Sequence, residues 1–122
     1  MNWGLIGIGA AIAFAGVGSA LGTGTAGMAA VGAWKKCFVQ NRPAPFILVA
    51  FVGFPLSQTI YGYLLMNRLA QAVAAGADAG YLLGAGVLGG IAIGMSAWFQ
   101  GRAAAAASDS MGETGKGTGN YI

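Results

Sequence analysis

The sequence predicts an all-α membrane protein, built as a duplicated transmembrane helical hairpin with three helices present of an expected four. Of its 122 residues, 57% are apolar, only 7% are charged and 23 are glycine. A water-facing surface needs several times more charge, so this composition argues against a soluble globular domain. The second observation behind the prediction is an internal repeat, described below.

Three stretches are apolar enough to cross a bilayer, which takes roughly 20 residues per helix. They cover about Trp3–Trp34, about Pro45–Leu69 and about Gly80–Ala107. The first stretch differs from a signal peptide, because no basic region precedes it and it stays apolar beyond the length of such a segment. We therefore expect three membrane helices.

Basic residues predict how these helices are oriented. Lys35, Lys36 and Arg42 follow the first span. In the second connection Arg68 is partly offset by Asp78. Because cytoplasmic connections carry the excess of lysine and arginine, we expect a multi-pass protein of the cell membrane with its N-terminus outside and its first and third connections cytoplasmic. The net charge of +3 then follows from topology, and no nucleic-acid partner is expected.

The first and third spans are similar to each other. A shift of 77 positions aligns residues 4–30 with residues 81–107 and superposes identical Gly, Ala, Ser and Leu residues. Such repeats are retained in membrane transporters. The chain is expected to divide into a first helical hairpin, residues 1–79, and residues 80–122, which would hold the first helix of a second hairpin and a polar cytoplasmic loop.

Small residues recur every three or four positions along one expected face of each of these two spans. They are Gly9, Ala13, Gly16, Ala20 and Gly24 in the first span, and Gly86, Gly90, Gly94, Ala97 and Gly101 in the third. Faces of this kind let helix backbones approach closely in lipid. One tight helix pair and a closed ring of identical subunits both fit this pattern.

The segment FPLSQTIYGYLL, residues 54–65, places polar side chains in an apolar run. Residues three or four apart share a helix face, so Ser57, Gln58 and Tyr61 can converge. Pro55 has no N–H and crowds a carbonyl of the preceding turn, which predicts a bend with available backbone oxygen. Neutral oxygens around a bend suit a weakly held cation. The alternative is that these groups only bond within and between helices.

Gln100 favours the cation site, because a second uncharged amide on a neighbouring helix can coordinate the same ion. A cation within a bilayer also needs a negative charge nearby. The three acids, Asp78, Asp109 and Glu113, are all expected in connections or in the tail. The repeat implies a fourth helix, in which the position equivalent to Gln58 would lie about a dozen residues beyond the last one given.

The sequence is accordingly expected to be truncated at its carboxy-terminal side. The alternatives are a three-helix relative that uses the acid of a partner chain and a structural ring component without an ion site.

These segments together resemble the proteolipid subunit K of V/A-type ATP synthases, the rotor-ring subunit built of two fused helical hairpins. The most specific motifs are P-x-S/T-Q-x-x-Y-G at residues 55–62 and Q-G-R at residues 100–102. The resemblance implies a ring of identical subunits that turns in the lipid bilayer against a stator a/I-type subunit. It also implies contact with central-stalk subunits and ion transport coupled to ATP synthesis or hydrolysis.

The resemblance also implies a site for the transported ion, Na⁺ or H⁺. Its ligands would be the carbonyl of Phe54 and the side chains of Ser57, Gln58 and Gln100. Tyr61 would donate a hydrogen bond to the carboxylate of the fourth helix. These additional oxygen ligands favour sodium, since a proton does not need them.

Other classes of protein are weighed against this one. The chain has no histidine, and its one cysteine, Cys37, has no base near it in sequence. Neither catalytic residues nor an organic cofactor is therefore expected, and we do not expect the chain to be an enzyme on its own. A small membrane exporter would also need an embedded carboxylate. A structural oligomeric membrane protein without an ion site stays open.

Overall fold

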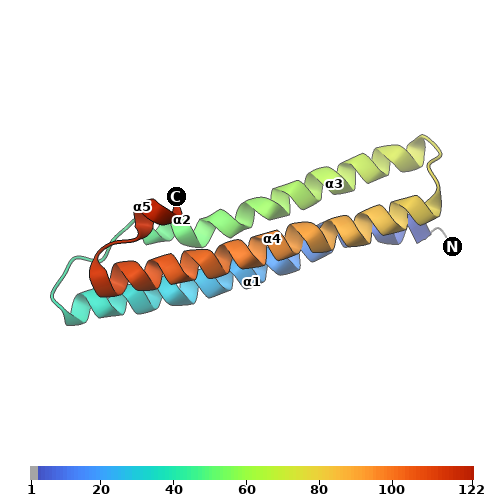
Figure 1. Cartoon of the computed structure of the whole chain (residues 1–122). Coiled ribbons are helices and arrows are strands. Elements are labelled where there is room, and N and C mark those ends of the chain that lie inside the picture. Colours follow the sequence, from blue (N-terminus) through green and yellow to red (C-terminus); the bar gives the residue numbers. More distant parts are fainter. Residues whose placement is uncertain (1–2) are drawn as a thin grey trace.

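The structure, a computed structural model, describes residues 3–122, and within that range it contains helices and no strand (Figure 1). The first long helix is α1, Trp3–Val39. The second membrane segment consists of α2, Leu48–Gly53, the 3₁₀ turn η1, Phe54–Leu56, and α3, Ser57–Ala74. The third is α4, Ala79–Thr114, and it is followed by the short helix α5, Thr118–Tyr121.

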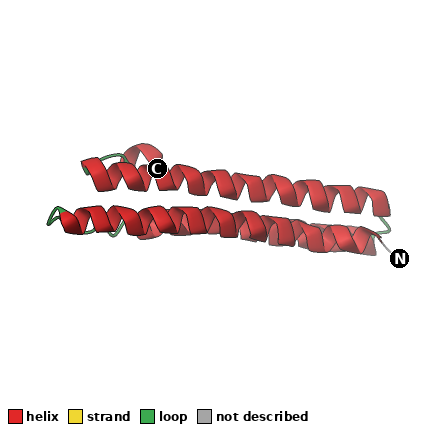
Figure 2. Ribbon diagram, turned by 90° about the horizontal axis from the view of Figure 1, so that it is seen from below, coloured by secondary structure: helices red, strands yellow, loops and turns green. Residues whose placement is uncertain are grey.

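Three of these segments are long and apolar enough to cross a membrane: Trp3–Val39, Leu48–Ala74 and Ala79–Thr114. The predicted all-α membrane fold is therefore confirmed, with the expected number of spans. Figures 1 and 2 show an elongated bundle in which α1 and α4 run in the same direction. The second segment, which ends in α3, runs in the opposite direction and connects the end of α1 to the start of α4. The common direction of the two repeated spans agrees with a duplication.

The α1 and α4 backbones touch along most of their length. A Cβ atom added to Gly18 would overlap the backbone of Gly94, and one added to Gly101 would overlap the backbone of Gly22. Because small residues allow this approach, van der Waals packing and not hydrophobic burial can hold the helices together in lipid. The contacting pairs are 76 and 79 positions apart, close to the repeat shift of 77, so equivalent parts of the two repeats lie side by side.

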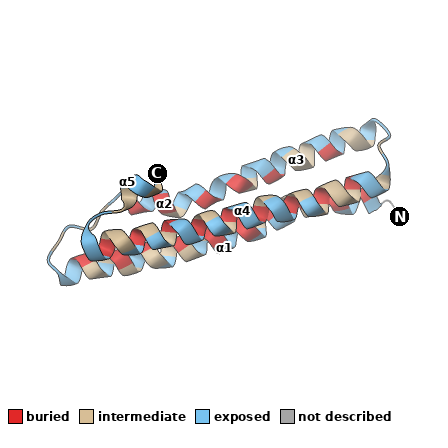
Figure 3. Cartoon of the chain, in the orientation of Figure 1, coloured by how far each residue is buried: buried red, intermediate tan, exposed pale blue. Residues whose placement is uncertain are grey.

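The predicted small-residue face is correct for α4 and wrong for α1. Gly86, Gly90, Gly94, Ala97 and Gly101 are all buried, as expected. In α1 the predicted stripe lies away from the helix pair, and Gly9, Gly16 and Gly24 have no neighbour within 4 Å of an added Cβ. The buried stripe of α1 is Gly4, Gly7, Ala11, Ala15, Gly18, Ser19, Gly22, Ala26, Ala30 and Ala33 (Figure 3). Small residues occur on both faces of α1, so spacing alone did not distinguish them.

Replacement of Gly94 by alanine is expected to destabilise the fold, by about 1–3 kcal/mol, the usual range for overpacking. The added methyl group would meet the Phe14 carbonyl and the Gly18 backbone, which cannot move aside as a side chain can. Gly16→Ala is the matched control, because its methyl group enters open space and alanine favours a helix. Denaturant unfolding in detergent micelles measures both variants, and equal stability of the two would contradict this packing.

The polar ends of α1 and α4 are helical where the sequence predicted connections. α1 continues beyond Trp34 to Val39. α4 continues beyond Ala107 to Thr114, where Gly115 ends it with a φ of 74°, in the left-handed region that favours glycine. Ser108 and Gly112 are buried in this extension, so the polar tract is amphipathic and packs against α1.

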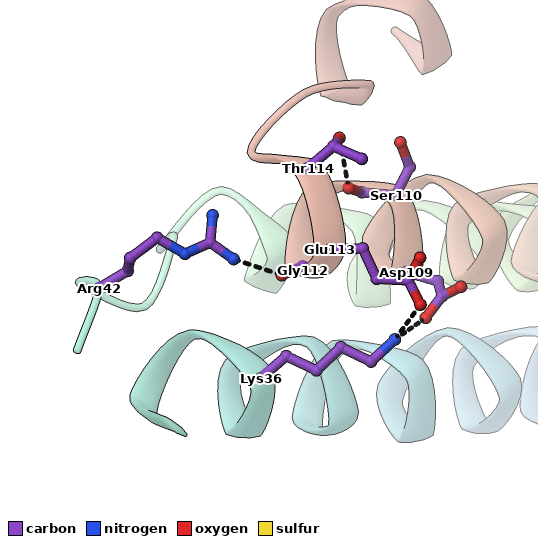
Figure 4. Close-up of polar contacts among 7 residues, drawn as sticks. All are labelled: Lys36, Arg42, Asp109, Ser110, Gly112, Glu113 and Thr114. Atoms are coloured by element: carbon purple, nitrogen blue, oxygen red, sulfur yellow. Dashed lines mark hydrogen bonds and ion pairs between the residues drawn. The ribbon is translucent and has the colours of Figure 1, made fainter. Parts of the chain in front are cut away.

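Charged contacts join these two extended ends (Figure 4). Nζ of Lys36, on α1, lies 2.5 Å from Oδ1 of Asp109 and 3.0 Å from Oε1 of Glu113, both on α4. Arg42 Nη2 donates to the carbonyl of Gly112 at 2.5 Å. A cation at a helix C-terminus also complements the helix dipole. Residues that the sequence placed in connections therefore lengthen the two helices and connect their ends through polar contacts.

Lys36→Met is expected to loosen the end of α4 while leaving the membrane helices intact. The two ion pairs are exposed, and exposed pairs contribute little to stability because water and salt screen them, so the effect should be local. Amide hydrogen exchange of residues 108–114 is expected to accelerate severalfold. Lys35→Met removes a neighbouring lysine that has no ion pair in the described chain; acceleration of the same size in that variant would argue against a role for the ion pairs.

Candidate functional site

The site lies where the second membrane segment bends. Pro55 cannot donate a backbone hydrogen bond, and here the α-helix gives way to the 3₁₀ turn of residues 54–56 before α3 begins. The backbone N–H of Ser57 bonds to the carbonyl of Phe54, which keeps the tighter turn hydrogen-bonded. The irregularity that Pro55 predicts in this helix is thus present as a short 3₁₀ interruption.

All three membrane segments meet at this bend. An added Cβ on Gly22 would lie 3.0 Å from Cβ of Pro55 and would overlap the carbonyl oxygen of Ala97. Gly22 thus brings α1 against both η1 and α4. The close approach places the polar side chains that follow Pro55 beside the polar side chain of α4.

A chain of hydrogen bonds connects these side chains. Ser57 Oγ lies 3.0 Å from the carbonyl oxygen of Phe54 and 3.1 Å from Oε1 of Gln58. Gln58 Nε2 donates to Oε1 of Gln100 at 2.7 Å, which links α3 to α4. Gln58 is only 8% exposed. The serine has one proton to donate, so it serves one of its two acceptors at a time.

The structure brings four of the five predicted site residues together: Phe54, Ser57, Gln58 and Gln100. Tyr61 is different, because it is 55% exposed and its side chain forms no hydrogen bond in the described part of the chain. The structure therefore does not join its phenol to Ser57 and Gln58 as the spacing predicted. Tyr61 lies one turn from Gln58 on the outer flank of α3. Its contact with a carboxylate therefore stays a prediction.

The cluster is electrically neutral. No group of three or more His, Cys, Asp or Glu residues suited to a metal ion occurs among residues 3–122. Asp109 and Glu113 pair with Lys36, and Asp78 caps α4 by accepting from the N–H of Tyr81 at 3.1 Å. Any cation bound to the cluster would thus have neutral oxygen ligands from this part of the chain and would need its counter-charge from elsewhere.

The cluster can supply oxygens on two sides of the Gln58 amide. The oxygen of Gln58 lies next to Ser57 and the Phe54 carbonyl, whereas its nitrogen faces Gln100. Because an amide oxygen has two lone pairs, that of Gln100 can accept this bond and still contact a cation. Hydroxyl, amide and backbone oxygens are suitable ligands for hard cations.

Tyr121 borders the site, and sequence reasoning did not include it. Its ring centroid lies 4.6 Å from that of Phe51 and 6.0 Å from that of Phe54. A pocket of about 330 Å³ is lined by Phe54, Gln100, Tyr121 and Ile122. Burial raises the pKa of the Tyr121 phenol above its ordinary value, and the nearby Gln100 amide opposes this rise. The contact depends on the fold-back of α5, for which the sequence carries no local signal.

Comparison of the chain with protein-family models, with curated proteins and with solved structures finds no match.

Gln100→Leu is expected to destabilise the protein by about 1–3 kcal/mol, the cost of leaving a buried amide donor without a partner. The donor in question is Nε2 of Gln58. Gln71→Leu, at an exposed position of α3, is the matched control. The double variant Gln58→Leu with Gln100→Leu should recover part of the loss, because both partners are then apolar. Additive losses in the unfolding measurements would show that the two amides do not interact.

Proposed function

We propose that this protein is an ion-translocating rotor-ring (proteolipid) subunit of a V/A-type rotary ATP synthase/ATPase. It carries Na⁺, or alternatively H⁺, across the membrane. It forms a ring of identical subunits that works against a stator subunit and turns with central-stalk subunits. The chain itself carries no catalytic residue; ATP synthesis or hydrolysis occurs elsewhere in the assembly.

The observation that carries this proposal is the hydrogen-bonded row of Ser57, Gln58 and Gln100 at the crossing of three membrane helices. Polar groups inside a membrane mark ion pathways when several converge on one point. Here a backbone carbonyl, a hydroxyl and two amides converge at a helix interruption. The resemblance of the P-x-S/T-Q-x-x-Y-G and Q-G-R motifs to those of rotor proteolipids supports the proposal, because it implies an ion site made of the same groups.

The mechanism requires a carboxylate beside these neutral ligands. A charge near the bilayer midplane costs at least about 2.5–3.5 kcal/mol, so a carboxylate that takes up a cation becomes effectively neutral and can then leave the stator for the lipid. Ser57, Gln58 and Gln100 would supply the oxygens that replace the hydration shell of Na⁺. The carboxylate would come from further chain beyond residue 122 or from a partner subunit.

Orientation follows from the same proposal. The end of α1 that carries Lys36 would face the cytoplasm, together with Arg42 after α1 and Lys116 after α4, in accordance with the positive-inside tendency. The N-terminus would then lie outside. The central-stalk subunits would meet the cytoplasmic ends of the ring.

The test uses the product of the native gene in its membrane assembly. A carbodiimide should label one buried carboxylate, and Na⁺ should slow this labelling, because the bound ion shields the carboxylate. Gln100→Leu should raise the Na⁺ concentration for half-protection at least about tenfold, since hydrogen bonds and ligands to charged groups contribute about 1.5–3 kcal/mol. Gln71→Leu should leave it unchanged.

The alternatives give other outcomes. A small exporter should show protection by an organic cation and not by Na⁺. A structural oligomer should show no labelled membrane carboxylate at all. Either result would refute the rotor proposal, and protection by low pH without any effect of Na⁺ would assign the proton as the transported ion.

A further inference from the structure

Ser19 is a buried hydroxyl beside the site that the proposed function does not use. It is 1% exposed, and its Oγ has no hydrogen-bond partner. A serine in a membrane helix usually bonds back to a carbonyl of the preceding turn. Thr25 on the same helix does so, with Oγ1 2.7 Å from the carbonyl of Leu21, but Ser19 does not. An unsatisfied buried hydroxyl is costly, so a partner near Ser19 is expected.

The packing of α1 against the bent segment identifies that partner. Toward the end of α1, Gly22 contacts Pro55. About two turns earlier, Ala15 contacts Gly62. The two segments run in opposite directions (Figure 1). Ser19 lies between Ala15 and Gly22 on α1, so it faces the part of the bent segment between Pro55 and Gly62. The buried residue on that turn is Gln58.

The Gln58 amide has unused hydrogen-bonding capacity in this direction. A primary amide offers two N–H donors and two oxygen lone pairs. The structure uses one N–H, toward Gln100, and one lone pair, toward Ser57. A second N–H is therefore available, and a hydroxyl oxygen such as that of Ser19 can accept it.

We propose that Ser19 is a positioning residue of the site: after a rotation of its side chain from the orientation in the structure, where Oγ has no hydrogen-bond partner, its hydroxyl accepts the second N–H of Gln58. With Gln100 and Ser19 both holding the nitrogen, the amide oxygen stays on the side of Ser57 and the Phe54 carbonyl. There it is oriented as a ligand for an alkali cation. The consequence for the cation rests on the proposed function, but the contact between Ser19 and Gln58 does not.

The contact is tested first without any cation. The chain contains four glutamines, at positions 40, 58, 71 and 100, so side-chain amide NMR signals of ¹⁵N-glutamine-labelled protein in micelles can be assigned by single substitutions. Ser19→Ala should shift the Gln58 NH₂ pair and speed its hydrogen exchange severalfold. Ser96→Ala is the control, because Ser96 is the repeat counterpart of Ser19 and is exposed on α4.

Unchanged Gln58 signals in Ser19→Ala would overturn the inference, and so would equal changes in Ser96→Ala. Ser19→Cys keeps nearly the same volume with a weaker acceptor, so it serves as a second variant and should shift the same signals to a smaller extent. Circular dichroism verifies that each variant retains its helices.

The positioning role is tested in the carbodiimide assay on the native assembly. Ser19→Ala should raise the Na⁺ concentration for half-protection about fivefold, the effect of one hydrogen bond of typical strength, and Ser96→Ala should not. If Ser19→Ala shifts the Gln58 NMR signals but does not change the Na⁺ concentration for half-protection, the hydrogen bond between Ser19 and Gln58 is supported and the positioning role is overturned. If neither Na⁺ nor low pH protects the unmodified assembly, the proposed function fails, while the NMR experiment still decides whether Ser19 holds the Gln58 amide.

Discussion

The close contact between the α1 and α4 backbones is the constraint on which the other features depend. Lipid chains are as apolar as leucine, so hydrophobic burial does not hold two helices together inside a membrane. At Gly18 and Gly94 the backbone of one helix occupies the space that a Cβ of the other would fill. Attraction then comes from many backbone contacts at short range. Along this line only very small residues fit, which explains why the repeat consists mainly of glycine and alanine.

The bent segment depends on this helix pair. Because the line between α1 and α4 lacks large side chains, the second segment has little apolar surface to interlock with there, and polar contacts contribute specificity. The 3₁₀ turn at Pro55 brings the segment against Gly22, and the amide bond from Gln58 to Gln100 ties it to α4. In the membrane such a hydrogen bond between helices contributes about 1 kcal/mol to their association. This contribution to stability is modest, but it is sufficient to define how the segments face each other.

The features that the sequence predicted well are those with local causes. Apolar length predicted three spans, and proline chemistry predicted that the second helix is interrupted. Helical spacing predicted that Ser57, Gln58 and Tyr61 converge; the hydroxyl of Ser57 and the amide of Gln58 do meet, whereas the exposed phenol of Tyr61 forms no hydrogen bond with them. The bond of Gln58 to Gln100 needed the additional assumption that their helices are neighbours. Which face of α1 is buried could not be predicted, because small residues lie on both sides of that helix. The helical ends carrying Lys36 and Asp109, like the position of Tyr121, depend on contacts between distant segments, which no local pattern encodes.

The distribution of charge bears directly on how a cation could be held. In the described chain, Asp109 and Glu113 balance Lys36 at the polar ends, and the middle of the bundle keeps neutral oxygens only. Neutral ligands alone do not offset the free-energy cost of placing a cation at this depth in the membrane. In the absence of a cation, the neutral groups satisfy one another by hydrogen bonds. An acid that completes the site must reach Gln100 from a side that α1 and α3 do not cover. The pocket lined by Phe54, Gln100, Tyr121 and Ile122 lies on such a side, so a further helix or a partner helix packed there would place a carboxylate next to the Gln100 amide.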